Sequence, residues 1–373
     1  MLVSLLVNFA TLLMLGAVLY AAPSPRLNPP AVPFGVRVPP DRADDPQVTE
    51  QRRRYRALLT PIAVVLTPTA LALGAVLDSV LVGAVAAPLL CAVAAALWWN
   101  AHRALVRAKE RGNWYGQVRQ GAVMDTSLRT DPVRLPWLWV VPSLVVLVVT
   151  AAAGAFAYPD LPATMPLPER GVGGTAHRDV ATTFWSAFGL VLVQTGVTAA
   201  LVGTAAAVLR ARPDLDVSRP RSSVARHRRH LALTVRALLG TGALLNLMLS
   251  GLSAMMWSGS RSGSLLLLVV GGPLLLAAAG SAPAVLRAAR PGGAAGAEAA
   301  EEDSGLVARD DDRHWRAAGT VYVNAGDPAV LVPRRVGRGW TVNLAHPRFL
   351  AGSGAVLALA LAAAAVNLAM GSG

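Results

Sequence analysis

Long, nearly uncharged apolar runs alternate with short charged segments along the chain. The runs span residues 2–22, 58–77, 80–99, 137–157, 184–209, 231–257, 265–286 and 349–370. Because a bilayer core of about 30 Å needs about 20 helical residues at 1.5 Å each, every run is long enough to cross a membrane. The pattern predicts an all-α integral membrane protein with eight transmembrane helices. A cleaved signal peptide is the alternative for the first run, but the arginines that follow it favour a retained span.

Three pairs of spans are joined by short connections, over residues 58–99, 137–209 and 231–286. The second connection is the YPDLP loop, predicted to lie outside. The longer segments between pairs are a proline-rich loop at 23–57, basic loops at 100–136 and 210–230, and an Ala/Gly/Glu linker at 287–302.

Within the segment 303–348, residues 315–347 differ in composition from the rest of the chain. β-Branched residues recur at alternate positions, and the alternation is broken by turn residues at 326–328 and 337–339. This pattern predicts two or three short strands. We therefore expect a small β-containing cytoplasmic module between helices seven and eight.

The charged residues set the expected orientation. The chain has 34 Lys and Arg against 21 Asp and Glu, a net charge of +13, and 31 of the basic residues fall in alternate connecting segments. Basic segments are retained on the cytoplasmic side, so both termini are predicted to lie outside a cytoplasmic membrane. Such loops attract anionic headgroups, and the absence of helix-turn-helix or zinc-ligand spacing disfavours nucleic acid as a partner.

Candidate chemistry within the spans is sparse. The amides Gln194, Asn246 and Asn367 could line a shared cavity or form hydrogen bonds between helices. No carboxylate or lysine lies near a span centre, which argues against ion-coupled transport. A lone Cys91 and dispersed histidines predict no metal site, no cofactor and no catalytic group.

Two segments carry candidate binding residues. Prolines stiffen the loop after span four, YPDLPATMPLPERG, which lowers the entropy lost on meeting a partner. A stiff crossover without a partner is the alternative. The candidate partner-binding residues there are Tyr158, Pro159, Leu161, Pro162 and Pro166.

The second segment is the module, whose aromatic and arginine side chains could hold a partner or the headgroups. Its candidate residues are Trp315, Tyr322, Asn324, Asp327, Pro328, Arg334, Arg335, Trp340 and Asn343. The segment PFGVRVP in the loop at 23–57 adds Phe34, Gly35, Arg37 and Pro39.

These segments resemble an uncharacterised family of bacterial multi-span membrane proteins. YPxLPxxxP is similar to a segment shared with immunity proteins against a sporulation-delaying toxin (DUF1648), although Leu167 to Arg170 depart from the family pattern. PFGVRVP followed by RRRYR resembles an N-terminal segment of the same family. W…YVNAGDPAVLVPRRVGRGWTVN resembles a module of unknown function (DUF5808). For the immunity relatives, the resemblance implies toxin resistance and membrane sequestration of a repressor.

The leading hypothesis is a non-enzymatic bacterial membrane protein that senses, or gives immunity to, an envelope-acting peptide or compound and signals to a cytoplasmic regulator. A transporter or lipid-handling protein that uses the amide-bearing spans is the second hypothesis. A membrane enzyme is the third, and it would need titratable groups such as Asp160, Glu169 and His177 to converge.

Overall fold

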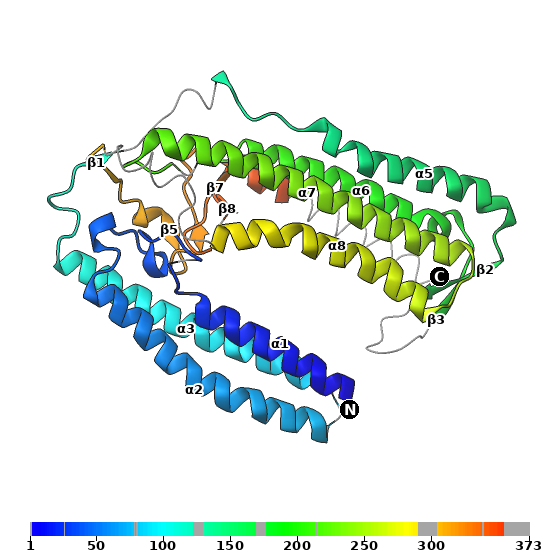
Figure 1. Ribbon diagram of the computed structural model, residues 1–373, viewed down its shortest axis with the longest axis horizontal. Coiled ribbons are helices and arrows are strands. Elements are labelled where there is room, and N and C mark those ends of the chain that lie inside the picture. Colours follow the sequence, from blue (N-terminus) through cyan, green and yellow to red (C-terminus); the bar gives the residue numbers. More distant parts are fainter. Residues whose placement is uncertain are drawn as a thin grey trace. The chain divides into compact units, whose positions relative to one another are not determined.

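A computed structural model describes residues 2–353 except 26, 78, 80, 122–129, 169–176, 214, 290–303 and 338. The chain forms two compact units (Figure 1). The first comprises the described residues of 1–124, 211–223 and 301–373, and the second those of 125–210 and 224–300. Each unit is described by itself.

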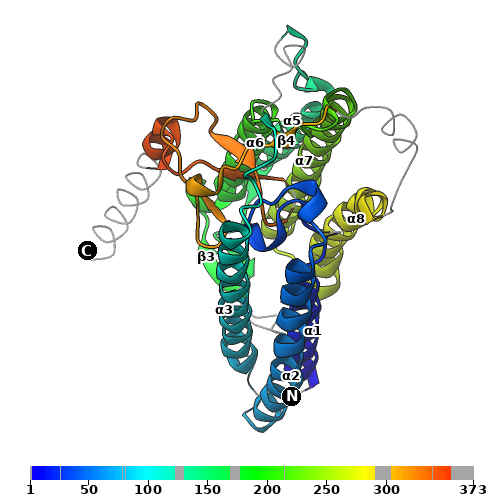
Figure 2. The same cartoon turned by 90° about the vertical axis from the view of Figure 1, so that its left-hand side faces the viewer.

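The first unit is built on three long helices that lie side by side, α1 (Leu2–Ala21), α2 (Pro46–Val76) and α3 (Leu81–Arg111) (Figures 1 and 2). Helix α2 begins a dozen residues before the predicted span. The Asp45 side chain caps it by accepting a hydrogen bond from the Gln47 amide at 2.9 Å, and Pro46 occupies the first turn. The charged run RRRYR is therefore helical and extends the apolar span.

The β module, which we define as residues 304–348, completes this unit. Its strands are short, and they form the pairs β5 with β6 and β7 with β8, both antiparallel. A fifth strand, β4, runs parallel to β1, which lies in the basic loop after α3. The bounds are β1 Gln120–Gly121, β4 Val307–Ala308, β5 Trp315–Arg316, β6 Val321–Tyr322, β7 Leu331–Pro333 and β8 Trp340–Val342. The predicted β-containing module is thus present, with more strands than expected.

The second unit contains the remaining long helices. They are α5 (Val141–Ala157), α6 (Phe184–Leu209), α7 (Pro220–Trp257) and α8 (Gly263–Ala289). Helix α6 has the bounds that its apolar run predicts, because Thr183 caps its start with Ser186 in a reciprocal capping box and Arg210 ends it. Helix α7 begins at Pro220, eleven residues before its predicted span, and includes the basic RHRRH segment at 226–230.

The connection between α5 and α6 departs from the expected extended chain. Tyr158–Asp160 form a turn of 3-10 helix, and β2 (Thr164–Pro168) then pairs with β3 (His177–Ala181) as an antiparallel hairpin. Pro166 and Pro168 are tolerated because a two-stranded hairpin has free edges that require no amide donor. Paired strands were not predicted here because prolines usually argue against them.

Five described helices are long and apolar enough to cross a membrane: α2, α3, the segment 137–160 with α5, α6, and α7 from Ser222. Two shorter apolar helices lie in α1 and α8, and most of the eighth predicted run lies outside the described residues. Large apolar side chains such as Leu81, Leu138 and Phe156 are exposed on these helices. Exposed apolar faces of this size are typical of contact with lipid. The chain is therefore a multi-pass membrane protein with five candidate spans among its described residues, against the eight predicted.

Candidate functional site

The segment 33–39 forms a tight turn. It packs toward the start of α2 and the end of α3, away from the connection between these two helices. Phe34 is only 2% exposed, and its ring contacts the rings of Trp98 and Tyr55 at centroid distances of 4.8 and 5.9 Å. Val36 and Val38 are also buried in this cluster. His102 Nδ1 lies 2.9 Å from the Phe34 carbonyl oxygen. The segment is therefore part of the core of this unit and not an exposed loop.

Gly35 of this turn meets Gly319 of the β module. Both glycines have positive φ, +76° and +81°, and a Cβ on Gly35 would overlap the Ala318 carbonyl oxygen. Phe34, Ala317 and Ala318 also have positive φ, which is strained for residues other than glycine. The Trp98 indole donates to the Ala318 carbonyl at 3.3 Å. Two left-handed turns are thus pressed together, and Gly35 is required for their approach.

Next to these turns, three acidic residues of the module bind three basic residues from different segments. We call Asp310, Asp311 and Asp312 the acidic triad. Lys109 of α3 places its Nζ 2.7 Å from Asp310 and 2.6 Å from Asp312. Arg37 donates through Nε to Asp311 at 2.8 Å and through its backbone amide to Asp312 at 3.1 Å. The triad therefore joins α3 and the turn to the module.

Arg335 is the most buried cation of the cluster, with a side chain that is 2% exposed. Its guanidinium binds Asp311 and Asp312 and also donates to the Gly35 carbonyl at 2.8 Å. The Trp315 ring lies 4.9 Å from the guanidinium carbon. Because a buried charge is stable only when paired, Arg335 and the triad depend on one another.

The pKa of Asp311 depends on two opposing effects, burial of the carboxyl and attraction to its arginine partners. Burial alone would raise it, but Arg37 and Arg335 outweigh burial and lower the pKa to about 2. For Arg37, burial lowers the pKa, but the nearby Asp311 carboxylate raises it further, above its ordinary value. Burial raises the pKa of Tyr115, whose ring lies 4.8 Å from Lys109 Nζ. Asp311 and Arg37 are thus both ionised at neutral pH.

Other predicted module residues form a second network around one tight turn. Asp327 accepts from Tyr322 at 2.9 Å and from Arg212 at 2.8 Å. Asn343 is fully buried and donates to the Asn324 carbonyl at 2.7 Å, while its oxygen accepts from the Asn324 amide. The Pro328 carbonyl oxygen lies 3.2 Å from His346 Nε2. These side chains hold the turn in shape and face the module interior.

The remaining module residues differ in how far they are buried. Trp315 is buried against Tyr322, whereas Arg334 is exposed and its Nε donates to the Trp340 carbonyl at 2.7 Å. Arg334 and Trp340 line a small hollow of about 290 Å³ that Phe349 also borders. Pro39 is buried at the end of the 33–39 turn. Adjacent arginines therefore have opposite environments, with Arg335 inside and Arg334 on the surface.

In the loop between α5 and α6, the predicted residues are spread over two elements. Tyr158 and Pro159 lie in the 3-10 turn, where the Tyr158 ring contacts Phe188 at 5.8 Å. Leu161 and Pro162 follow it, and Pro166 lies in β2. The hairpin is tied to the loop before α8 by Arg261, which binds both oxygens of Asp179 at 2.7 and 2.9 Å.

The intramembrane amides Gln194 and Asn246 are brought together between α6 and α7, and both are fully buried. Gln194 Nε2 donates to the Asn246 carbonyl at 2.8 Å, and Asn246 Nδ2 donates to Thr198 at 2.8 Å. Their side-chain oxygens, Oε1 and Oδ1, have no hydrogen-bond partner. Asn367 and Glu169 lie outside the described residues, so their predicted roles are untested.

Several residues of these networks were missed from the sequence, among them Lys109, Arg212, His102 and the acidic triad. The sequence does distinguish Lys109, since it is the one lysine among 34 Lys and Arg residues. Arg212 and His102 contact residues 115 and 68 positions away, and no local pattern marks them. Within the described part of the chain, no three His, Cys, Asp or Glu side chains gather at metal-binding spacing.

One segment of the chain matches a known protein family. Residues 326–349 match a family of unknown function (DUF5808), which covers the turn at Asp327, Arg334, Arg335 and strand β8. No family model for the YPxLPxxxP segment matches. No curated protein and no solved structure matches the chain.

Proposed function

We propose that this protein is a non-enzymatic sensor of the bacterial cytoplasmic membrane, which responds to an envelope-acting peptide or compound and signals to a cytoplasmic regulator. The observation that carries the proposal is the buried Arg335, which links the module to the Gly35 turn through the acidic triad. We further propose the eight-span arrangement, with the positive-inside distribution placing the module in the cytoplasm and both termini outside.

A paired cluster of this kind can act as a switch. Breaking any one pair leaves a buried charge without a partner, which costs a large amount of free energy. The module is therefore held or released as a unit. A shift of Arg37 or Lys109 that accompanies movement of the membrane helices would weaken the cluster at several bonds together. Release would expose the Trp98, Ala318 and Gly319 surface to a cytoplasmic partner.

The test of this proposal is a deletion strain complemented by matched variants. Deletion should change susceptibility to cationic envelope-active peptides or the expression of neighbouring genes. Wild type and Arg334→Gln should restore the response, because Arg334 lies on the surface, whereas Arg335→Gln should not. If deletion changes neither property, the sensor proposal fails.

A transporter is the second candidate, favoured by the unpartnered oxygens of Gln194 and Asn246. Acceptors without donors in a bilayer suit a solute that carries N–H donors or positive charge. We expect Gln194→Leu or Asn246→Leu to abolish efflux of a cationic dye such as ethidium while the protein still inserts. Thr204→Val, at an exposed position on α6, is the control. Unchanged dye efflux on deletion of the gene would exclude this candidate for cationic solutes.

A further inference from the structure

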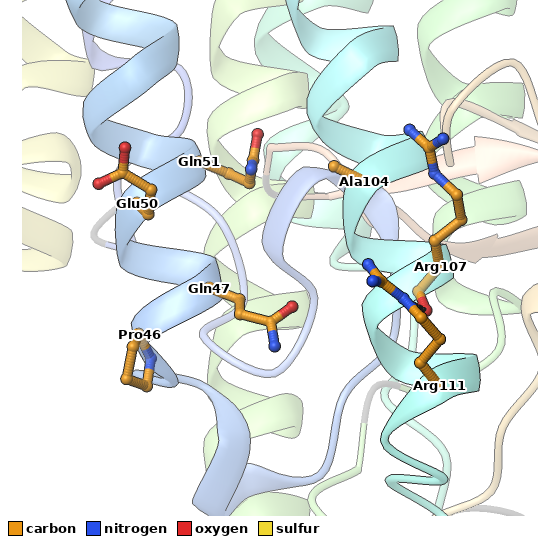
Figure 3. A pocket seen from close by; sticks show the side chains of 7 residues that line it. All are labelled: Pro46, Gln47, Glu50, Gln51, Ala104, Arg107 and Arg111. Carbon is orange, nitrogen blue, oxygen red and sulfur yellow. Dashed lines mark hydrogen bonds between the residues drawn. The ribbon is translucent and has the colours of Figure 1, made fainter.

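A hollow of about 610 Å³ lies between the first two turns of α2 and the last turns of α3. Gln47, Glu50 and Gln51 line it from α2, and Ala104, Arg107 and Arg111 line it from α3 (Figure 3). This volume is in the range of small-molecule sites. The small side chain of Ala104 leaves room between the two helices. The hollow is separate from the acidic triad and is not used by the proposed switch.

The two arginine side chains of this hollow are exposed, and each has one hydrogen bond to its own helix. Arg107 Nε donates to the Arg103 carbonyl and Arg111 Nε to the Arg107 carbonyl, both at 3.2 Å, so each side chain runs back along α3. Their terminal nitrogens stay available, and no carboxylate lies within 4 Å of them in the described part of the chain. Figure 3 shows Gln47 directed from α2 toward Arg111 across the gap, while Gln51 lies further along α2, level with Ala104.

The charges of the hollow favour an anion. Two guanidiniums face one carboxylate, and Figure 3 shows Glu50 on the side of α2 turned away from α3. Of the nearby acids, Asp44 pairs with Arg52, and Asp45 caps α2 and pairs with Arg42. Glu110, which precedes Arg111 on α3, does not line the hollow. The residues that line the hollow therefore carry a surplus of one positive charge.

We propose that this hollow is a binding site for a phosphate group. Two guanidiniums one helical turn apart and two opposing amides supply more donors than the two oxygens of a carboxylate can accept, whereas a phosphate presents three terminal oxygens. The expected contacts are the terminal nitrogens of Arg107 and Arg111 with the phosphate oxygens, and the amide nitrogens of Gln47 and Gln51 completing the shell. The inference does not depend on the sensor proposal.

The phosphate can come from a soluble molecule or from a lipid headgroup. Because the arginines run back along α3, their guanidiniums lie near the levels of residues 103 and 107, four and eight residues beyond Trp99. At 1.5 Å per residue these levels are about 6 and 12 Å past the apolar run. A headgroup layer is about 5 to 8 Å thick on each side of the bilayer. The site thus opens at the border between headgroups and water.

The experiment uses the full chain in nanodiscs and has two arms. In phosphatidylcholine nanodiscs, inorganic phosphate and pyrophosphate are titrated by calorimetry. In nanodiscs that also contain phosphatidic acid, native mass spectrometry counts the retained anionic lipids. The variant pair is Arg107→Gln with Arg111→Gln, and the charge-matched control is Arg53→Gln with Arg54→Gln, two exposed α2 residues that do not line the hollow. Circular dichroism confirms that each variant is helical.

We expect the hollow variant to weaken binding by about tenfold or more in at least one arm, because charge-assisted hydrogen bonds are each worth about 1.5 to 3 kcal/mol. The control should change it by less than about twofold. Gln47→Leu with Gln51→Leu, which keeps both arginines, should weaken it by several fold. Loss in the calorimetry arm identifies a soluble phosphate, and loss in the lipid arm alone identifies a headgroup. Equal weakening in hollow and control variants, or no binding in either arm, overturns the proposal.

Discussion

Both units hold polar groups away from water, but the first does so with charges and the second with neutral amides. Around Arg335, each carboxylate of the acidic triad has a cationic partner. Between α6 and α7, Gln194 and Asn246 share hydrogen bonds but keep two oxygens without partners. The charged cluster lies beyond the apolar runs, where ionised groups can stay charged, whereas the amides lie near the centre of theirs. We infer that the charged cluster makes docking of the module all-or-none, whereas the amides contribute more weakly to helix association.

The largest effect should follow from Arg335→Gln. The change leaves Asp311 and Asp312 with a missing partner in a buried cluster, which typically costs about 3 to 5 kcal/mol. Limited proteolysis of the full chain in detergent should then cut the β module faster. Arg334→Gln, the exposed neighbour, is the control, and equal cleavage of both variants would contradict the distinction between them.

Gly35→Ala should come next. Its Cβ would overlap the Ala318 carbonyl, and φ of +76° is strained for alanine, so we expect a loss of about 1 to 3 kcal/mol of docking stability. Gly326→Ala is the matched control, because its Cβ meets only the Asn324 side chain at 3.5 Å and its φ is not positive. Thermal unfolding followed by tryptophan fluorescence measures both. A Gly35→Ala protein as stable as the control would show that the two turns are not pressed together.

Acid should weaken the charged cluster in a defined window. The pKa of Asp311 is lowered to about 2, so its contribution to stability is present above its ordinary value near 4 and is lost as the pH falls toward 2. This contribution is about 2 kcal/mol for one carboxyl. Unfolding temperatures measured between pH 6 and pH 2.5 should fall most below pH 4, and Asp311→Asn should flatten that part of the profile. The amide network should show no such dependence, since it has no titratable group.

The smallest effect is expected from Gln194→Met. Hydrogen bonds between helices in membranes are worth about 0.6 kcal/mol on average, and the unpartnered Gln194 oxygen offsets part of that gain. We expect a change within about 1 kcal/mol in unfolding by a denaturing detergent. A loss of several kcal/mol would mean that the Gln194 oxygen has a partner of its own, such as a bound water.

The apolar runs predicted where helices lie but not where they end. Helix α6 matched its run because Thr183 caps its start and Arg210 ends it. Helices α2, α3 and α7 instead continue well into charged sequence. A charge marks the edge of a membrane, while a helix ends only where a cap or turn stops it. The β2–β3 hairpin was missed because its prolines usually signal unpaired chain.

The site was only partly predictable. Phe34, Gly35, Arg37 and Arg335 were singled out, but as separate surfaces, and the structure joins them in one cluster. The bond between Arg37 and Asp311 spans 274 residues, and no spacing rule reaches that far. The sequence contains three consecutive aspartates and a lone lysine, but only the fold determines which cation meets which acid.

A zero-length carbodiimide cross-link tests the docked module most directly, because Lys109 is the only lysine in the chain. Its Nζ lies 2.7 Å from Asp310 and 2.6 Å from Asp312, and Asp310 is about one-third exposed. Treatment of the full-length protein in nanodiscs should yield, by mass spectrometry, a peptide pair that joins Lys109 to Asp310 or Asp312, and Arg335→Gln should reduce its yield. A Lys109 that is freely acylated by an amine-reactive ester and forms no link to the acidic triad would contradict the account.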